Sequence, residues 1–318
     1  MPNFHEDVVP EFTLRQLSYL IAAADAGTIA SASRHLHVSS SALSDAITEL
    51  ERSLDVKLAV RRKAHGLTLT SAGERIVADA RHLLRSAREL RMAIKAEPGE
   101  LVGPITIGCY PTLVPTVLPH LLRGFEERHP KIDLVILEIT HERLDERLAA
   151  GEIDAAFIYD ALVPGHPFRE HLYALPQHIL LAADHPLAHR ESIRLEEMIN
   201  DDLILLDIPP SSENTLNLFT SRGIAPRVRH RTASYEAVRT LVGRGLGYGI
   251  LMHRPVNPAS YEGLPVIMKN ISPPVEPVAV DVIWSVELEP PQRVRALIDF
   301  AKRVAWPTLA DASTLESE

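Results

Sequence analysis

Apolar residues in the first quarter of the chain recur at steps of three and four, the spacing of one face of an α-helix. In the first helical stretch they are Leu14, Leu17, Ile21 and Ala24, and Gly27 is expected to end the helix. A second, short helix follows over about 29–36, and after a turn at 37–39 the pattern predicts a third over about 40–54. Helices joined by such a tight turn form the helix-turn-helix arrangement.

The next segment predicts a small β-hairpin and then a long helix. Leu67-Thr68-Leu69-Thr70 alternates like a strand, and His65-Gly66 before it can form the turn. Ser71-Ala72-Gly73-Glu74 has the spacing of a capping box and opens an amphipathic helix that continues to about residue 94. A long amphipathic helix at this place is a natural element for joining two copies of the chain.

Beyond about residue 103 the pattern changes to short apolar strands that alternate with helices. The predicted strands cover 105–108, 133–139, 155–158, 178–183, 203–206, 247–251 and 278–286. The predicted helices cover 113–128, 144–150, 213–222, 235–243 and 292–304. Repeated strand–helix units indicate a largely parallel sheet with helices on both faces.

The charges divide the chain into two parts. Its formal net charge of −9 argues, taken alone, against a nucleic-acid partner. Residues 1–97, however, contain 13 Lys/Arg and 12 Asp/Glu, whereas the remainder contains 20 and 30. The basic residues of the first part cluster at Arg52, Lys57, Arg61, Arg62 and Lys63. A basic patch followed by an acidic remainder suggests two functions on one chain.

Other features of the composition point to the cytoplasm. The apolar runs are far shorter than the roughly 20 residues that span a bilayer, so we expect no membrane segment. The first nine residues lack the basic start and apolar stretch of a secretory signal. The single cysteine, Cys109, excludes an internal disulfide framework, and we expect it to be a buried, inert thiol.

Two groups of polar residues are candidates for DNA contact. The first lies at the start of the third predicted helix and comprises Ser39, Ser40, Ser41, Ser44, Asp45 and Thr48. A recognition helix places such N-terminal side chains against base edges in the major groove, although a serine-rich helix start can also simply face water. The second lies around the hairpin turn and comprises Arg61, Arg62, Lys63 and His65. These residues suit phosphate contacts or minor-groove insertion, with a solvated charge run as the alternative.

The first 75 residues resemble, at many fixed spacings, the signature of LysR-type transcriptional regulators. The matching runs include Ala22-Ala23-Ala24-Asp25-Ala26-Gly27-Thr28, Ala32-Ser33-Arg34-His35-Leu36-His37-Val38-Ser39 and Leu67-Thr68-Leu69-Thr70-Ser71-Ala72-Gly73. After residue 100 the resemblance is looser and rests on Gly151-Glu152-Ile153-Asp154-Ala155-Ala156, Ala183-Asp184-His185-Pro186-Leu187-Ala188 and the run from Leu241 to Gly249. The resemblance therefore covers nearly the whole chain.

Four positions depart from the family pattern. The family usually has Gln-Pro where this chain has Ser40-Ser41, and often a basic or polar residue where it has Asp45. Asp45 would repel phosphates but could accept a hydrogen bond from a cytosine amino group. Ala59 stands where the family usually has Phe. The resemblance thus implies that the helix reads DNA, but it does not imply which bases are read.

The resemblance implies an α+β multidomain fold. Its parts are a winged helix-turn-helix domain at 1–70, a linker and dimerisation helix at 71–97, an effector-binding domain at 98–306 and a tail at 307–318. The effector-binding domain would resemble a type 2 periplasmic binding protein, with the ligand held between two α/β lobes. Those lobes would cover about 104–174 with 279–306, and about 175–278.

The ligand crevice is expected at the carboxyl ends of strands. After the strand at 105–108, free backbone N–H groups and a helix dipole would favour an anion; Thr112 adds a hydroxyl there or, alternatively, caps the helix. The candidate effector-binding residues are Tyr110, Pro111, Thr112, Tyr159, Ile208, Pro209, Ser211, Thr232 and Ser234. Arg169 is a candidate partner for a carboxylate, with an ordinary surface position as the alternative.

The resemblance implies a transcription regulator rather than an enzyme, without cofactor or metal. We expect its partners to be double-stranded operator DNA, a small-molecule effector such as an anionic metabolite, and further copies of the chain in a homodimer or homotetramer; RNA polymerase is a further candidate. A solute-binding protein or an α/β enzyme is the alternative. The former leaves residues 1–97 unexplained, and the latter lacks a visible catalytic constellation. Some family members sense oxidants with a cysteine pair, which this chain does not contain.

Overall fold

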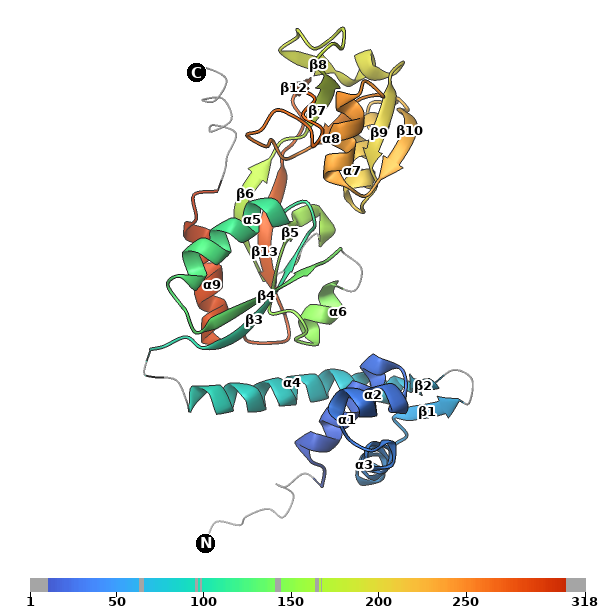
Figure 1. Cartoon of the computed structure of the whole chain (residues 1–318), viewed down its shortest axis with the longest axis vertical. Helices are drawn as coiled ribbons and strands as arrows, with labels where there is room; N and C mark the ends of the chain where they lie inside the picture. The colour runs from blue at the N-terminus through green and yellow to red at the C-terminus, as the bar shows by residue number, and fades with distance from the viewer. Residues whose placement is uncertain are drawn as a thin grey trace. The chain divides into compact units, whose positions relative to one another are not determined.

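The computed structural model of the chain describes residues 11–62, 66–94, 97, 99–140, 144–163, 166 and 168–306. The chain divides into two compact units (Figure 1). One contains the chain up to Gly103 together with Glu146–Glu152, and the other contains Pro104–Asp145 and the chain from Ile153 onward.

The first unit contains the predicted helices, hairpin and long helix. They are α1 (Leu14–Ala26), α2 (Ile29–Leu36), α3 (Ser40–Ser53), β1 (Ala59–Arg62), β2 (Gly66–Leu69) and α4 (Ser71–Ala93). Thr13 and Gln16 form a capping box at the start of α1, and Gly27 ends that helix in the left-handed conformation with φ +66°. Because Ser39 and Thr70 cap α3 and α4 in the same way, each helix starts where a hydroxyl can satisfy a free N–H group.

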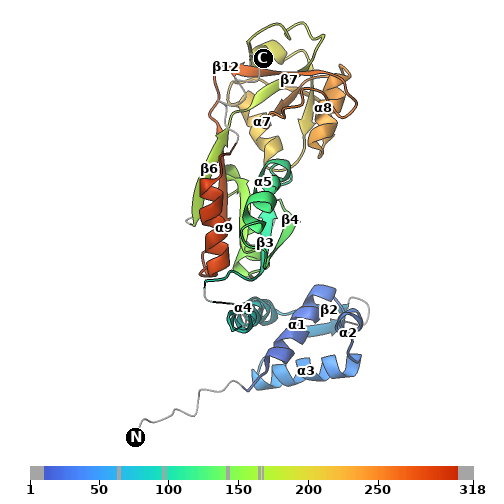
Figure 2. The same ribbon diagram turned by 60° about the vertical axis from the view of Figure 1, so that its left-hand side comes forward.

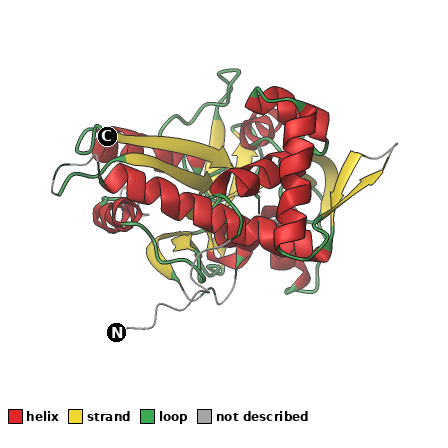
Figure 3. Ribbon diagram, turned by 90° about the horizontal axis from the view of Figure 1, so that it is seen from below, coloured by secondary structure: helices red, strands yellow, loops and turns green. Residues whose placement is uncertain are grey.

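The core of this unit joins the helices to the hairpin. Its most deeply buried side chains, all at most 2% exposed, include Leu17, Leu20, Ala32, Leu43, Ile47, Leu50 and Leu58. The hairpin, seen at the right of Figure 3, starts its second strand against the end of α1, where the Leu67 N–H donates to the Gly27 carbonyl at 2.8 Å. A Cβ at Gly66 would clash with that same carbonyl oxygen, so this close approach requires glycine.

The first lobe of the second unit is built on a five-stranded sheet of order β4-β3-β5-β13-β6. Its strands are β3 (Gly103–Cys109), β4 (Ile132–Glu138), β5 (Ala155–Tyr159), β6 (Arg169–Leu175) and β13 (Val278–Trp284). Its helical segments are α5 (Val114–Leu121), the π-helical η2 (Leu122–Glu126), the 3-10 turn η3 (Asp160–Leu162) and α9 (Gln292–Arg303); α6 (Leu144–Ala149) crosses the division between the units. The rings of Phe125 and Phe300 lie 5.6 Å apart and pack η2 against α9. Helix α9 also lies beside β6 (Figure 2).

The second lobe is built on a four-stranded sheet of order β11-β7-β12-β8, beside the parallel pair β9–β10. Its elements are β7 (His178–Ala182), β8 (Ser192–Arg194), η4 (Leu195–Met198), β9 (Asp202–Leu206), α7 (Ser211–Thr220), β10 (Arg227–Thr232), α8 (Tyr235–Gly243), β11 (Gly249–Leu251) and β12 (Val266–Ser272). Ile179, Leu203, Phe219 and Tyr248 are at most 1% exposed and form its core.

The prediction of a largely parallel sheet is wrong. Strand β13 runs antiparallel to both β5 and β6, and β7 runs antiparallel to both β11 and β12. The physical reason is the path of the chain, because β6 leads to the second lobe and its neighbour β13 brings the chain back (Figure 1). Strands β6, β8, β10 and β12 were also not predicted from the sequence. In β10, arginines alternate with Val228 and His230, so the strand lacks the apolar face that would reveal it.

Candidate functional site

Helix α3 presents one exposed polar stripe. Ser41, Asp45, Thr48 and Arg52 are all exposed and follow one another at steps of four, three and four residues. The opposite face of the same helix carries the buried Leu43, Ile47 and Leu50. The core thus fixes which face of α3 points outward. Arg52, which forms an ion pair of 3.0 Å with Glu49, was not among the predicted contact residues.

The other serines near the start of α3 form hydrogen bonds within the helix-turn-helix motif. The Ser39 hydroxyl accepts from the Ala42 N–H at 3.1 Å and lies 3.1 Å from the Ser41 hydroxyl. The Ser40 hydroxyl lies 2.8 Å from that of Ser33 on α2, so it ties the two helices of the motif together. Ser44 is half-buried, and its carbonyl accepts from the Thr48 hydroxyl.

The hairpin β1–β2 carries the second group of predicted DNA contacts. Arg61 pairs with Leu67 and Arg62 with Gly66, at the end of the ladder. The side chains of these two arginines, and Lys63 and His65 altogether, lie outside the described residues.

A buried carboxylate fixes the base of the hairpin to α3. Glu51, 8% exposed, accepts from the backbone N–H groups of Leu58 at 2.9 Å and Ala59 at 3.2 Å, and from the Lys57 ammonium at 2.6 Å. Burial raises the pKa of the Glu51 carboxyl, but these hydrogen bonds outweigh it, and the pKa lies below its usual value. Glu51 is therefore ionised and sets the position of the hairpin relative to α3.

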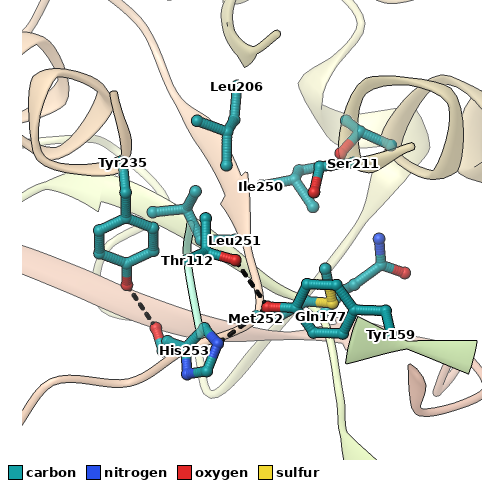
Figure 4. Close-up of a pocket in the computed structure, with 11 residues that line it drawn as sticks. Thr112, Tyr159, Gln177, Leu206, Ser211, Tyr235, Ile250, Leu251, Met252 and His253 are labelled. Atoms are coloured by element: carbon teal, nitrogen blue, oxygen red, sulfur yellow. Dashed lines mark hydrogen bonds between the residues drawn. The ribbon is translucent and has the colours of Figure 1, made fainter. Parts of the chain in front are cut away.

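A small pocket lies between the two lobes of the second unit (Figure 4). Thr112 and Tyr159 come from the first lobe, where they follow or end strands β3 and β5. The second lobe supplies the remaining lining residues, which are Gln177, Leu206, Ser211, Thr215, Tyr235, Ile250, Leu251, Met252 and His253. The pocket thus brings strand ends and helix starts of both lobes together.

A chain of hydrogen bonds crosses the pocket from lobe to lobe. The Tyr159 hydroxyl lies 2.8 Å from the Thr112 hydroxyl and 2.8 Å from His253 Nε2 (Figure 4). His253 Nδ1 lies 3.3 Å from the Thr116 hydroxyl, and the Tyr235 hydroxyl donates to the His253 carbonyl at 2.6 Å. His253 of the second lobe is thereby held by hydroxyls of the first.

Burial keeps the ionisable groups of this chain of hydrogen bonds uncharged. It lowers the pKa of His253 to about 4. It also raises the pKa of Tyr159 and of Tyr235 above the usual range. At neutral pH the imidazole and both phenols are therefore neutral.

A second link between the lobes lies beside the pocket. The Tyr110 hydroxyl is 3.2 Å from the carbonyl oxygens of Ile208 and Pro209 and 3.1 Å from the Ser211 hydroxyl. Its ring packs edge-on against that of Tyr159, with centroids 5.2 Å apart. Tyr110 itself is fully buried, so it acts as a fixed bridge.

Of the nine predicted effector-binding residues, Thr112, Tyr159 and Ser211 line the pocket. Tyr110, Ile208 and Pro209 form the adjacent link, whereas Pro111, Thr232 and Ser234 do not line the pocket. Ser234 caps α8 instead. Several lining residues were not predicted from the sequence, among them Gln177, Thr215, Tyr235, Met252 and His253. Met252 and His253 directly follow a predicted strand, so the strand-end rule could have found them.

The expectation of free N–H groups after β3 is wrong for most of this turn. The Tyr110 and Leu113 N–H groups donate to the carbonyls of Phe157 and Tyr110, and Pro111 and Pro115 have none. Thr112 does not cap the helix either, because α5 has no side-chain cap.

Two further candidates are engaged elsewhere. Arg169 donates to the buried Asp281 at 3.1 Å, so it is neither a free surface residue nor part of the pocket. Cys109 is fully buried, and burial raises the pKa of its thiol. Within the described ranges no cluster of His, Cys, Asp or Glu could hold a metal ion. None of the described helices is long and apolar enough to cross a membrane.

Comparison with known proteins gives matches over most of the chain. Residues 14–74 match the bacterial regulatory helix-turn-helix proteins of the lysR family, and residues 98–306 match the LysR substrate binding domain. HinK, a LysR family transcriptional regulator from Pseudomonas aeruginosa, is 30% identical, covers 92% of this chain and 98% of its own, and has a TM-score of 0.61.

Two further solved structures extend the comparison. A full-length single-residue variant of OxyR from Pseudomonas aeruginosa is 27% identical, covers 93% of this chain and 99% of its own, and has a TM-score of 0.69. CbnR complexed with its target DNA is 25% identical, with coverage of 92% and 99% and a TM-score of 0.52.

Proposed function

Because the chain belongs to the LysR family of bacterial transcription regulators, we propose that its α3 and hairpin bind operator DNA in response to a small molecule held between the two lobes. It is a DNA-binding transcription regulator with an effector-binding domain of the type 2 periplasmic-binding-protein kind. Its place of action is accordingly the cytoplasm, where the bacterial chromosome lies.

In this proposal the exposed stripe of α3 enters the major groove. Ser41, Asp45 and Thr48 face the base edges, whereas Ser39, Ser40 and Ser44 set the position of the helix start. Arg61, Arg62, Lys63 and His65 of the hairpin contact phosphates or the minor groove. The observation that carries the proposal is that the packed core leaves one polar face of α3 exposed, in a chain similar to the DNA-bound CbnR.

Selection of DNA sites from a random pool by the full chain tests this reading. Replacing Thr48 by Ala should cost about 1–3 kcal/mol in binding to the selected site and relax preference at one base position. Asp45→Asn should strengthen binding to random DNA, because it removes a negative charge that the DNA phosphates repel. Ser71→Ala, at the exposed start of α4, is the control that should change neither. Unchanged site preference in Thr48→Ala and Asp45→Asn together would contradict the assignment of α3.

Helix α4 supports a dimer or a tetramer. Leu83 and Leu90 of α4, and Ile94 directly after it, are 47%, 68% and 78% exposed and follow one another at steps of seven and four residues. An apolar seam with this spacing is suited to the same helix of a second copy. Light scattering of the full chain should give the mass of two or four copies, and Leu90→Glu should reduce it.

The link between the lobes supports control by a ligand. Tyr159 and Tyr110 of the first lobe hold His253 and Ser211 of the second, so a ligand that enters the pocket must rearrange these contacts. A ligand that binds one lobe arrangement more tightly shifts the population of the chain towards it. The mechanism we propose is therefore a change in lobe arrangement rather than oxidation of a thiol, since Cys109 is buried and is the only cysteine of the sequence.

We further propose that the pocket is not catalytic. Its imidazole, His253, contacts the hydroxyls of Tyr159 and Thr116 rather than Ser211, so no serine–histidine pair is present among the described residues that line it.

A further inference from the structure

The middle of the exposed stripe of α3 carries two side chains that offer only hydrogen-bond acceptors. Asp45 is exposed and forms no hydrogen bond or ion pair with another described residue. A carboxylate has acceptors and no donor in its ionised form. The Thr48 hydroxyl donates its single proton to the Ser44 carbonyl at 2.9 Å, so its oxygen can only accept from a molecule outside the helix. These two positions therefore match a partner that donates.

The side chains of the stripe that can donate lie at its two ends and have partners within the chain. The Ser41 hydroxyl lies 3.1 Å from that of Ser39, and the Arg52 guanidinium donates to the Glu49 carboxylate at 3.0 Å. Between these ends, the exposed described residues of α3 include no side chain with a free N–H or O–H group; they are Ala42, Asp45, Thr48 and Glu49.

Donors are the exception among the base edges of the major groove. Only the amino groups of cytosine and adenine donate there, whereas guanine and thymine present acceptors. The adenine amino group lies between two acceptors, its own N7 and O4 of the paired thymine. The cytosine amino group has an acceptor on one side only, O6 of the paired guanine. Because both oxygens of a carboxylate are negative, a carboxylate is repelled least at cytosine.

The helix spaces the two acceptors for neighbouring base pairs. Asp45 and Thr48 are three residues apart, which is about 4.5 Å along a helix axis, and base pairs are stacked about 3.4 Å apart. The buried Leu43 and Ile47 on the opposite face fix the direction in which both side chains point. We propose that α3 selects operator DNA with a cytosine opposite Asp45 and a cytosine or an adenine opposite Thr48, at the next base pair. This inference rests on the proposed function and names the bases that the resemblance to the family left open.

Selection from a random DNA pool by the full chain and its variants tests the base assignment. The wild type should enrich a C·G pair at one position of each half-site and bind it at least about fivefold more tightly than the same site with a T·A pair there. Asp45→Asn should move this preference to A·T, because an asparagine side chain can bind both N6 and N7 of adenine. Asp45→Ala should lose the preference at this position alone, and Thr48→Val should lose it at the neighbouring position alone. Ratios of affinities are compared, because removal of a negative charge strengthens binding to all DNA.

Glu49→Gln is the matched control for charge. It removes one carboxylate from the same exposed helix, but this carboxylate already binds Arg52, so the base preference should remain that of the wild type. Base analogues then show which base of the selected pair is read. A cytosine without its amino group (2-pyrimidinone) should weaken binding of the wild type at least about fivefold more than binding of Asp45→Ala, and 7-deazaguanine in the paired strand should leave binding unchanged.

The possible outcomes separate this inference from the proposed function. The base assignment is overturned by an unchanged preference in Asp45→Asn and Asp45→Ala, by the same loss of preference in Glu49→Gln, or by a loss of affinity with 7-deazaguanine. An unchanged preference in Thr48→Val overturns the assignment of the neighbouring pair. In each of these cases the wild type still enriches a sequence and remains a DNA-binding regulator. A wild type that enriches no sequence overturns the proposed function together with the base assignment.

Discussion

Replacement of Glu51 should detach the base of the hairpin from α3. Its carboxylate accepts from the N–H groups of Leu58 and Ala59 and is 8% exposed, and Leu58 is fully buried. Glu51→Ala leaves the Leu58 N–H buried without an acceptor, which costs about 1–3 kcal/mol. Lys57, with a side chain 76% exposed, adds at most about 1 kcal/mol. We therefore expect a loss of about 1–4 kcal/mol for Glu51→Ala.

Glu51→Gln tests the role of the charge alone, because the amide oxygen of Gln can still accept from the N–H groups of Leu58 and Ala59. It removes the charge that strengthens these bonds and pairs with Lys57, so we expect a smaller loss of about 1 kcal/mol. Glu49→Ala, two residues away on the same helix with a side chain 58% exposed, is the matched control and should change stability by less than about 0.5 kcal/mol.

Hydrogen exchange of the full chain reads this effect locally. The amides of residues 58–62 and 66–70 should exchange at least about fivefold faster in Glu51→Ala, and more slowly than that variant in Glu51→Gln, while amides of the second unit remain unchanged. Affinity for selected DNA should fall in the same order, since the hairpin would no longer be held against α3. Equal exchange in Glu51→Ala and Glu49→Ala would refute the reasoning.

Four further predictions concern pH, the link between the lobes and the DNA contact of the hairpin. The pKa of Glu51 is lower in the folded chain than in the unfolded chain. The ionised Glu51 therefore stabilises the fold fully above the unfolded pKa of about 4.3, and this stabilisation is lost as the pH falls through the lower folded pKa. Acid should accordingly release the hairpin in the wild type but should have no such added effect in Glu51→Gln. The pKa of His253 is also lowered in the folded chain, to about 4. The neutral imidazole therefore stabilises the link between the lobes fully above about pH 6.5, and this stabilisation is lost as the pH falls towards 4. Calorimetry should detect this pH dependence of stability, and the same pH dependence in His253→Gln would contradict the assignment. Tyr159→Phe removes the hydroxyl between Thr112 and His253 and should increase proteolysis between the lobes, with Tyr261→Phe, an 88% exposed position, as the control. Arg62→Ala should lower the salt dependence of DNA binding by about one phosphate contact per subunit, and an unchanged slope would exclude that contact.

The elements that could be predicted are those whose sequence signals lie within a few residues of one another. The helices of the first unit have capping residues at their ends and apolar residues on one face, as Thr13, Gly27 and Ser39 illustrate, and these signals act within a few positions. Strand direction has no such local signal. Nothing in the residues of β13 shows that it returns beside β6 after the whole second lobe has been formed.

The pocket shows the same limit. Tyr159 and Thr112 could be predicted because they end or follow apolar strands, whereas Gln177 and Thr215 face the pocket only because of how the lobes fold together. Most of the free N–H groups expected after β3 are not found, because Pro111 and Pro115 have none and those of Tyr110 and Leu113 donate to backbone carbonyls. Which side chains face the pocket, and which N–H groups are already hydrogen-bonded, depends on tertiary contacts and does not follow from the sequence pattern.

The central claim is tested most directly by titrating the full chain with DNA selected from a random pool, at salt concentrations from about 50 to about 300 mM, with and without a compound that stabilises it. We predict binding that weakens steeply with salt, a protected region that spans more than one half-site, and a change in that region when the compound is present. Absence of DNA binding at the lowest salt concentration would contradict the account, and a footprint that the stabilising compound leaves unchanged would contradict the coupling between pocket and DNA.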